Sequence, residues 1–279
     1  MTTHNNSGAA SFRLRLRTQP TLRLELAGLT PLAVAGQSAV ELARRPLWHG
    51  NEAVPLGEWF DVEPIPGDDA TLVFEGDVSR CDGIGRDLDG GRIRVEGDAG
   101  DYVGAGMRDG EIVVAGGAGM LAACEMAGGK LEVGGNVGDY AASALPGDMD
   151  GMRGGLLIVR GDAGARFGDR MRRGTALVFG ATGDFLASRM VAGTIAVAGE
   201  VGAHCGYGMR RGTLVFAGAQ PEPPRSFVAT PHDIGVIWVL LVRSLAKHGG
   251  PFAGLAVSRP RRLVGDLAAD GKGEWLLPG

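Results

Sequence analysis

The sequence predicts a mainly β protein, a right-handed parallel β-helix built as a single-stranded solenoid of 19-residue glycine-rich repeats, with an N-terminal α+β cap and a C-terminal helix. Glycine accounts for 49 of the 279 residues, against about 7% in an average protein. Glycines and apolar residues recur at a fixed interval, and apolar residues alternate with others inside each repeat, as in a β-strand. We expect three parts: a hairpin and cap over 1–70, the solenoid over 71–219, and a linker, helix and tail over 220–279.

The repeat is visible in consecutive segments such as RIRVEGDAGDYVGAGMRDG and EIVVAGGAGMLAACEMAGG, and it resumes after an insertion with LLIVRGDAGARFGDRMRRG. Each copy opens with two apolar residues two positions apart: Leu72/Phe74, Ile93/Val95, Ile112/Val114, Leu131/Val133, Leu157/Val159, Ala176/Val178, Ile195/Val197 and Leu214/Phe216. A glycine follows each pair: Gly76, Gly97, Gly116, Gly135, Gly161, Gly180, Gly199 and Gly218. Stacked in register, the pairs would form ladders around one continuous core, and the glycines would permit corners and close approach between coils.

Methionine and aspartate also recur at fixed positions of the repeat. Methionines occupy one register of the repeat, and we expect their adaptable thioethers to fill a corner of the core: Met107, Met126, Met152, Met171, Met190 and Met209. Asp77, Asp98 and Asp162 follow strand glycines, and we interpret them as turn carboxylates that accept from local backbone amides, not as calcium ligands. Two other repeat folds are not favoured. A leucine-rich repeat would need a leucine ladder with a recurring Asn or Cys, and a left-handed β-helix would show hexapeptide periodicity; the sequence has neither pattern.

The N-terminal flank is expected to cover one end of the solenoid. Residues 12–26, FRLRLRTQPTLRLEL, alternate apolar and charged residues on both sides of a Gln-Pro pair, which predicts an antiparallel hairpin. Ser38 and Glu41 have the spacing of a capping box and predict a short helix.

The C-terminal flank contains the one long helix that we expect. Thr230 is the predicted N-cap, followed by Pro231 and Asp233, and Gly249 is the predicted stop. An apolar stripe on this helix comprises Ile234, Ile237, Trp238, Leu241 and Leu245. We predict that the stripe packs on the solenoid; docking to a partner through Trp238 is the alternative. The tail from residue 261 is expected to return to the body as a strand and loop.

Seven extra residues lengthen the copy that holds Gly138 and Met152. Insertions in solenoids protrude from one face and often serve recognition. We therefore predict a protein interface at the loop of residues 144–151, with these candidate residues: Leu145, Pro146, Asp148, Met149 and Asp150.

Charge and cysteine content exclude several classes of protein. Lys and Arg total 28 and Asp and Glu total 32, so the chain lacks the basic field that nucleic acid binding requires. Cys81, Cys124 and Cys205 are too few and too scattered for a disulfide framework. The N-terminus lacks the apolar core of a signal peptide, and the longest apolar run is too short to cross a bilayer. We expect a cytoplasmic protein.

A catalytic or metal site is not predicted. The histidines form no metal-ligand motif: His4, His49, His204, His232 and His248. His204 and Cys205 are adjacent, but neighbours on an extended chain point to opposite faces. The sequence contains no nucleophile elbow and no phosphate-binding loop. We predict no catalytic residue and no metal ligand, and we assign no cofactor-binding residue.

The run GMRGGLLIVRGDAGARFGDRMRRGTALVFGATGDFLASRM, with the preceding ARRPLWHGNEAVPLGEWFDV, resembles the C subunit of formylmethanofuran dehydrogenases and of bacterial formyltransferase/hydrolase complexes. The resemblance covers residues 38–218. The repeat alone also resembles the C-terminal domain of glutamate synthase large subunits, which implies the same fold.

The resemblance implies a non-catalytic scaffold in a complex that moves a formyl group from tetrahydromethanopterin to methanofuran and hydrolyses it to formate, within one-carbon metabolism. It implies amidohydrolase-like, pterin-dehydrogenase-like and formyltransferase partner subunits, with zinc and methanofuran held by those partners and no cofactor bound by this chain. The Ala- and Arg-rich composition favours this bacterial complex. The alternatives are the C subunit of a molybdenum or tungsten formylmethanofuran dehydrogenase, a glutamate-synthase-like amidotransferase component, and an independent glycan-active enzyme, which would show a charged cluster on one solenoid face.

Overall fold

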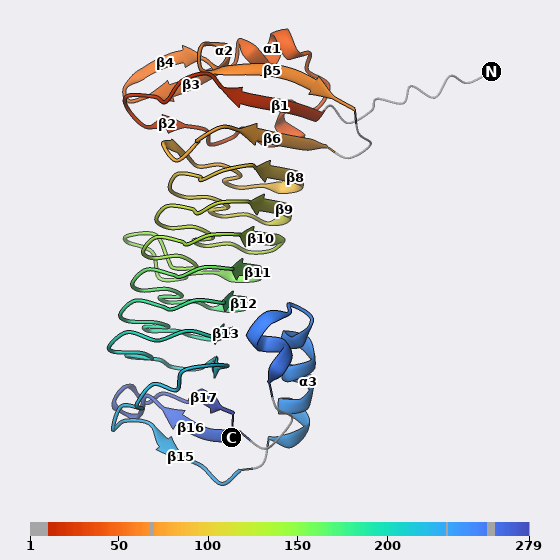
Figure 1. Ribbon diagram of the computed structural model, residues 1–279. Coiled ribbons are helices and arrows are strands. Elements are labelled where there is room, and N and C mark those ends of the chain that lie inside the picture. Colours follow the sequence, from red (N-terminus) through yellow and green to blue (C-terminus); the bar gives the residue numbers. More distant parts are fainter. Residues whose placement is uncertain (1–10, 67–69, 233, 256–259, 279) are drawn as a thin grey trace, which may run out of the picture.

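A computed structural model describes residues 11–66, 70–232, 234–255 and 260–278 of the chain. The protein is mainly β, as predicted, and one large sheet runs along its whole length (Figure 1). This sheet has 13 strands in the order β15-β16-β17-β14-β13-β12-β11-β10-β9-β8-β6-β1-β5, and a second sheet has four in the order β4-β3-β2-β7.

The stacked coils each contribute one strand to the large sheet, and neighbouring strands run parallel. These strands are β6 (Thr71–Glu75), β8 (Asp89–Val95), β9 (Asp109–Val114), β10 (Lys130–Val133), β11 (Arg153–Val159), β12 (Arg173–Val178), β13 (Thr194–Val197) and β14 (Thr213–Phe216). Every residue of the predicted apolar pairs is buried, and each pair aligns with the pair of the next coil. The predicted ladders are confirmed.

The interior also contains the recurring methionines. All six methionines of the predicted register are buried at 0% exposure, so their predicted role as core filling is confirmed. A shorter column of bridges joins the coils on another side, from Val78↔Ala99 to Thr182↔Val201.

The recurring acidic residues bond differently from the prediction. Asp77 accepts from Ser79 N within its own turn, as expected. Asp98 and Asp162 instead accept from the amides of Gly117 and Ala181, 19 residues further along and therefore one coil away. The coils stack so closely that a short carboxylate reaches the next backbone, which ties the corners of successive coils together.

The glycines that follow the strands are required mainly because neighbouring coils lie too close together for a side chain to fit between them. Among them only Gly76 has a φ in the left-handed region, at 98°. At Gly199, for example, an added Cβ would lie under 3.0 Å from backbone atoms of Gly180 and Ala181 in the preceding coil. Close approach, one of the two predicted reasons for these glycines, therefore accounts for most of them.

The N-terminal flank forms an α+β cap, but the predicted hairpin is wrong. The cap contains β1 (Ser11–Leu16), β2 (Leu24–Glu25), η1 (Leu32–Val34), α1 (Ala39–Ala43), β3 (Pro46–His49), β4 (Glu52–Pro55), α2 (Leu56–Trp59), β5 (Phe60–Ile65) and β7 (Cys81–Asp82). Strand β1 pairs with β5 and β6, so both of its edges are occupied. Strand β2 therefore joins β3 and β7 in the other sheet. The capping box of Ser38 and Glu41 is confirmed.

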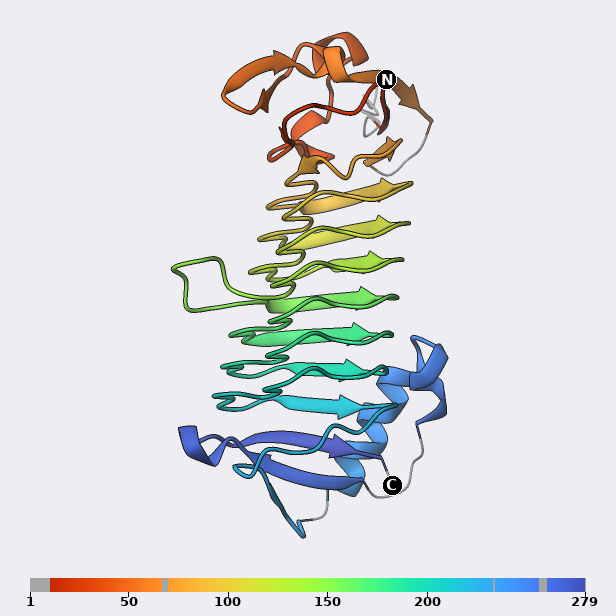
Figure 2. The same cartoon turned by 60° about the vertical axis from the view of Figure 1, so that its left-hand side comes forward.

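The C-terminal flank comprises β15 (Val228–Ala229), α3 (Gly235–Ala246), η2 (Gly250–Gly254), β16 (Arg261–Gly265), η3 (Leu267–Ala269) and β17 (Gly273–Leu277). Strand β17 pairs with β14, and β16 and β15 follow it, so the tail returns to the body as predicted. Helix α3 lies along the side of the lower coils (Figures 1 and 2).

The predicted start of this helix is wrong. Helix α3 begins at Gly235 with Ile234 as its N-cap. Thr230 N donates to Arg262 O, and the Thr230 hydroxyl bonds His232 Nδ1 at 2.7 Å, so strand pairing holds Thr230 away from the helix. Asp233 lies outside the described residues.

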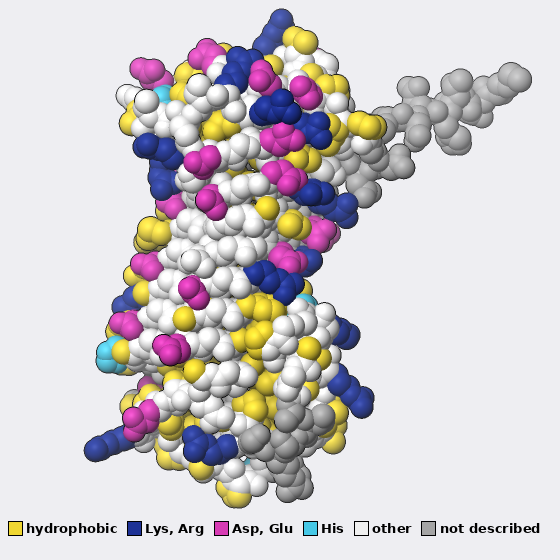
Figure 3. All heavy atoms as spheres, in the orientation of Figure 1, with side chains coloured by type: hydrophobic (Ala, Val, Ile, Leu, Met, Phe, Trp, Pro, Cys, Tyr) yellow, Lys and Arg dark blue, Asp and Glu magenta, His cyan; other side chains and the backbone are white. Residues whose placement is uncertain are grey.

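The inner face of α3 packs on the outward side of four coils. Trp238, Val242 and Leu245 are buried there against a row that the strands provide: Ile158, Leu177, Ala196 and Val215. Ile237 was predicted in this stripe but is 65% exposed, beside Val236 and Leu240 on the outer side of the helix. Hydrophobic side chains are visible along this border in the lower half of the molecule (Figure 3).

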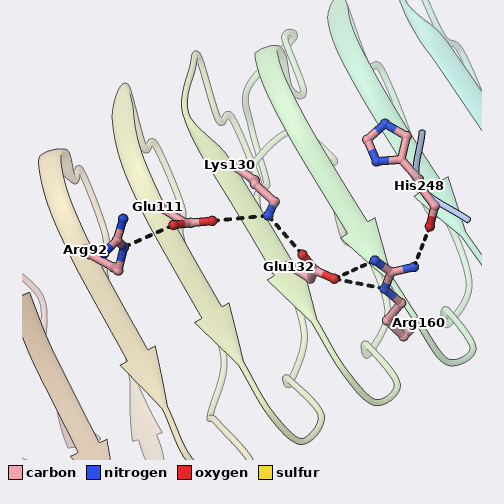
Figure 4. Close-up of polar contacts among 6 residues, drawn as sticks. All are labelled: Arg92, Glu111, Lys130, Glu132, Arg160 and His248. Atoms are coloured by element: carbon pink, nitrogen blue, oxygen red, sulfur yellow. Dashed lines mark hydrogen bonds and ion pairs between the residues drawn. The ribbon is translucent and has the colours of Figure 1, made fainter. Parts of the chain in front are cut away.

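The same outward side of the upper coils has a line of charged residues. Glu111 accepts from Arg92 and Lys130, Lys130 contacts Glu132, and Glu132 accepts from Arg160 (Figure 4). Arg160 in turn donates to His248 O at 3.0 Å. The line thus connects the upper coils to the segment that follows α3.

This line predicts a defined acid sensitivity. Lys130 holds the pKa of Glu111 below its usual value, so ionised Glu111 stabilises the fold above the carboxyl's unfolded pKa of about 4.3, and this contribution is lost as the pH falls through the lower folded value. Glu111→Gln is expected to cost up to about 1 kcal/mol at neutral pH, since the side chains are partly exposed, and nothing at a pH below the folded value. Chemical denaturation at several pH values measures this difference.

Glu200→Gln is the matched control, since the exposed Glu200 side chain makes no ion pair within the described residues. It should change stability little at either pH. An equal loss for Glu111→Gln at neutral and acid pH would contradict the predicted role of its charge.

Candidate functional site

Each coil turns through a corner where alternate residues adopt left-handed backbone angles. In one copy these are Tyr102, Gly104 and Gly106, with φ of 62°, 63° and 66°. The pattern favours glycine at every second position, and several copies place large residues there despite the strain. The first of the three positions is occupied, coil by coil, by Gly83, Tyr102, Leu121, Tyr140, Arg166, Phe185 and His204.

These first positions form a ridge of side chains along the outside of the corner. The Arg166 guanidinium lies 4.5 Å from the centre of the Phe185 ring and 5.8 Å from that of Tyr140. The Phe185 ring stacks on His204 with 4.7 Å between centres. His204 is exposed and Cys205 is buried, although His204 has a φ of 60° and so does not lie on the extended chain that the prediction assumed.

The inserted loop protrudes from the stack between β10 and β11 (Figure 2). It borders a pocket of about 610 Å³ on this ridge. The pocket is lined by Tyr102, Met120, Leu121, Tyr140, Ala144, Leu145, Pro146, Gly147, Asp148, Met149, Asp169, Arg170 and Arg189. One wall is aromatic and aliphatic, and the other is charged.

Hydrogen bonds fix the loop over the pocket. Arg170 Nη1 donates to Asp148 O at 2.7 Å, and Leu145 N donates to Glu125 Oε1 at 3.2 Å. Arg172 pairs with Asp150 at 2.5 Å. The loop is therefore held at both ends by side chains of the coils.

The charged wall centres on an ion pair whose carboxylate is buried and whose guanidinium group is partly exposed. Asp169 is 4% exposed and accepts from Arg189 Nε at 3.0 Å and Nη2 at 2.6 Å. Nearby, burial and the adjacent Asp148 carboxylate raise the pKa of Glu125. Paired guanidinium and carboxylate groups suit recognition of polar ligands.

The described residues show neither a metal-ligand cluster nor an activated thiol. Within those ranges, no three His, Cys, Asp or Glu side chains gather into a possible metal site. Burial raises the pKa of Cys81 and of Cys124 to about 12 and raises that of Cys205 as well, so these thiols are poor nucleophiles. All three cysteines are free.

Of the predicted interface residues, Leu145, Pro146, Asp148 and Met149 line the pocket together, and Asp150 lines the hollow beside it. Trp238 lies elsewhere: it is 1% exposed and packs against the protein's own sheet, so its prediction as an interface residue is wrong.

Four pocket residues were not among the predicted site residues: Tyr102, Tyr140, Arg170 and Arg189. A signal for them was available, because these bulky residues occupy positions where other copies of the repeat have glycine. Large side chains retained in a strained conformation often mark functional surfaces.

Comparisons with known proteins agree with this architecture. The family model described as GXGXG motif matches residues 58–226. None of the helices in the described parts of the chain is long and apolar enough to cross a membrane.

The curated relatives belong to two kinds of complex. The chain is 42% identical over 87 residues to the C subunit of the formyltransferase/hydrolase complex Fhc of Methylorubrum extorquens, covering 31% of this chain and 32% of the relative. It is 37% identical over 91 residues to the C subunit of tungsten-containing formylmethanofuran dehydrogenase 2 of Methanothermobacter thermautotrophicus, covering 32% of this chain and 34% of the relative. The matched segments thus span about a third of the relatives' own length.

A solved structure extends the likeness to nearly the whole chain. It is the formyltransferase/hydrolase complex from Methylorubrum extorquens with methylofuran, and one of its chains matches with a TM-score of 0.88 and 41% identity. The match covers 96% of this chain and 99% of that one. This chain therefore belongs to the GXGXG motif family and, within it, to the group formed by the C subunits of formyltransferase/hydrolase complexes and formylmethanofuran dehydrogenases.

Proposed function

We propose that this chain is a non-catalytic structural component of a formyltransferase/hydrolase complex, which moves a formyl group from formyl-tetrahydromethanopterin to methanofuran and releases formate. The observation that carries the proposal is the end-to-end likeness to a chain of such a complex, at 41% identity over 96% of this chain. A family likeness confined to the repeats would support only a shared fold.

We further infer that the stack is a right-handed parallel β-helix. One strand per repeat, parallel pairing between neighbours and a second column of bridges support this inference. Such a rod is stiff along its axis, because each coil is bonded to the coils on both sides, and stiffness suits a scaffold that holds other subunits at fixed separations.

The proposal leaves the chemistry to the partners. The corner pocket has the Arg189–Asp169 ion pair, with a buried carboxylate, and its described lining residues include no nucleophile beside a base, which supports a binding role for this surface. We propose that amidohydrolase-like, pterin-dehydrogenase-like and formyltransferase subunits assemble with this chain in the cytoplasm, and that they hold the zinc and the methanofuran.

The C subunit of a formylmethanofuran dehydrogenase is the second candidate. Its support is the 37% identity to the corresponding component of the tungsten-containing enzyme over 91 residues. The two candidates differ in their companions, since the dehydrogenase would add a tungsten or molybdenum protein and iron–sulfur proteins.

Affinity purification of the tagged chain from its native host tests both candidates. The intact chain is expected to bring down three other subunits at fixed stoichiometry, and metal analysis of the eluate should detect zinc without tungsten or molybdenum. Recovery of the chain alone would contradict the scaffold proposal, and a tungsten or molybdenum protein in the eluate would favour the dehydrogenase.

A deletion variant tests the inserted loop separately. Removing residues 144–150 joins Ser143 to Gly151 and restores the repeat to 19 residues, so the coil should still close. We expect this variant to fold and to lose at least one partner in the same purification. Full recovery of all partners would contradict an interface at the loop while leaving the scaffold proposal intact.

A further inference from the structure

Two pairs of arginines border a hollow beside the corner of the lower coils. The hollow has a volume of about 360 Å³ and is lined by Arg172, Arg173, Val191, Ala192, Arg210 and Arg211. All four arginines are exposed. The four guanidinium groups around this hollow repel one another, and their clustering does not help to stabilise the fold.

The repeat places these arginines in two columns. Two copies read Met-Arg-Arg, at residues 171–173 and 209–211, and the copy between them reads Met-Val-Ala at 190–192. Val191 N donates to Met171 O and Arg210 N donates to Met190 O, so 172, 191 and 210 follow one another coil by coil. The two pairs are therefore two coils, or about 10 Å, apart at the usual strand spacing, and the smaller residues between them leave the hollow.

Little negative charge from the protein compensates these arginines. Arg172 pairs with Asp150 at 2.5 Å. Arg173, Arg210 and Arg211 have no carboxylate oxygen within 4.0 Å among residues 11–66, 70–232, 234–255 and 260–278. Three guanidinium groups are thus available to an anion from outside.

The hollow continues toward the inserted loop. A second hollow of about 520 Å³ shares Arg172, Val191 and Arg210 with the first and reaches Arg170 and Arg189. In this second part the protein's own carboxylates pair with Arg172 and Arg189, through Asp150 and Asp169, while Arg210 has no carboxylate partner among the described residues. Carboxylates of the protein itself therefore pair with two of the guanidinium groups on the side of the hollow that faces the inserted loop.

We propose that this arginine trough, formed by Arg172, Arg173, Arg210 and Arg211 with Val191 and Ala192 as its floor, binds an acidic peptide segment in an extended conformation. A single small anion would satisfy one arginine pair, whereas an extended chain places the side chains of one face about 7 Å apart, and the flexible arginine and carboxylate side chains span the remaining difference from about 10 Å. Such a chain presents carboxylates to both pairs at once, and bidentate guanidinium–carboxylate bonds are the strong ones. This proposal does not depend on which complex the chain joins.

Binding of a fluorescent hexa-aspartate peptide to the full-length chain, followed by fluorescence anisotropy at low and high salt, tests the proposal. We expect binding that weakens with salt and is absent for hexa-asparagine. The double variant R210Q/R211Q is expected to weaken binding about tenfold or more, since charge-assisted hydrogen bonds at two residues are removed. The variant should fold normally, because both side chains are exposed and unpaired within the described residues, and its melting temperature checks this.

Arg108→Gln is the matched control. Arg108 follows Met107 in the same register of the repeat but lies several coils away, with Asp87 at 3.6 Å. This variant should bind the peptide as the wild type does. Equal weakening by Arg108→Gln, or unchanged binding by R210Q/R211Q, would overturn the assignment to the trough. Competition by inorganic phosphate at concentrations comparable to the peptide would overturn the requirement for an extended chain.

Discussion

Gly199→Ala is expected to lower the free energy of unfolding by roughly 3 kcal/mol, in the upper range for overpacking a tightly packed site. The new Cβ would lie under 3.0 Å from backbone atoms of Gly180 and Ala181, and neither backbone can move without breaking the ladder. The φ of Gly199 lies outside the left-handed region, so alanine carries no conformational penalty there and the loss reports coil separation alone. Thermal and urea denaturation followed by circular dichroism measure it.

Gly254→Ala is the matched control for this substitution. Its φ is also ordinary, and an added Cβ would meet no atom within 4 Å. Its stability should stay within about 0.5 kcal/mol of the wild type. Similar melting temperatures for Gly199→Ala and Gly254→Ala would contradict the view that the glycine column sets the distance between coils.

Trp275→Ala is expected to cost about 4 kcal/mol, as for other large aromatic residues removed from a core. Trp275 is fully buried, and its ring centre lies 5.0 Å from that of Phe216 and 4.9 Å from that of Phe227. It continues the inward ladder beyond the last coil, where it pairs in register with Leu214. Losing it would also loosen the strand that covers the end of the stack, so we expect faster self-association of the variant in size-exclusion chromatography.

Two further substitutions serve as comparisons. Trp275→Phe keeps a buried ring without the indole N–H, and Trp48→Ala removes an exposed indole. The Trp275 N–H has no hydrogen-bond partner among the described residues, so Trp275→Phe should lose less stability than Trp275→Ala. Trp48→Ala changes a 56% exposed indole and should be nearly neutral. A loss for Trp48→Ala as large as that for Trp275→Ala would contradict the role given to the buried ring.

The coils were predictable because the repeat fixes their register. The spacing of Ile93, Ile112 and Leu131 alone required parallel neighbours with one shared core, and the structure aligns these residues directly. Local patterns at the ends were less informative. The alternation on both sides of Gln19-Pro20 was interpreted as a hairpin, because sequence alone does not reveal that β5 and β6 occupy both edges of β1.

The candidate site was partly predictable. The extra length between Gly135 and Gly161 located the loop and five of its residues, whereas the opposite wall of the pocket came from coils far away in sequence, at Tyr102 and Arg189. The sequence also indicates which coils α3 covers. The residue between the two members of the apolar pair is itself apolar at Ile158 and Leu177, where α3 packs, but charged at Arg94. That change marks the coils on which the predicted stripe of the helix, Trp238 included, packs.

Each 19-residue coil adds the same length to the stack, so the number of coils sets the distance between its two ends. Helix α3 packs on the coils of β11 to β14, so one 19-residue copy added between β9 and β10 would leave that contact unchanged and would lengthen the stack by about 4.8 Å. Proteins attached to opposite ends would then move apart in equal steps. Evolution, or an engineer, could set the distance between two attached enzymes by counting copies.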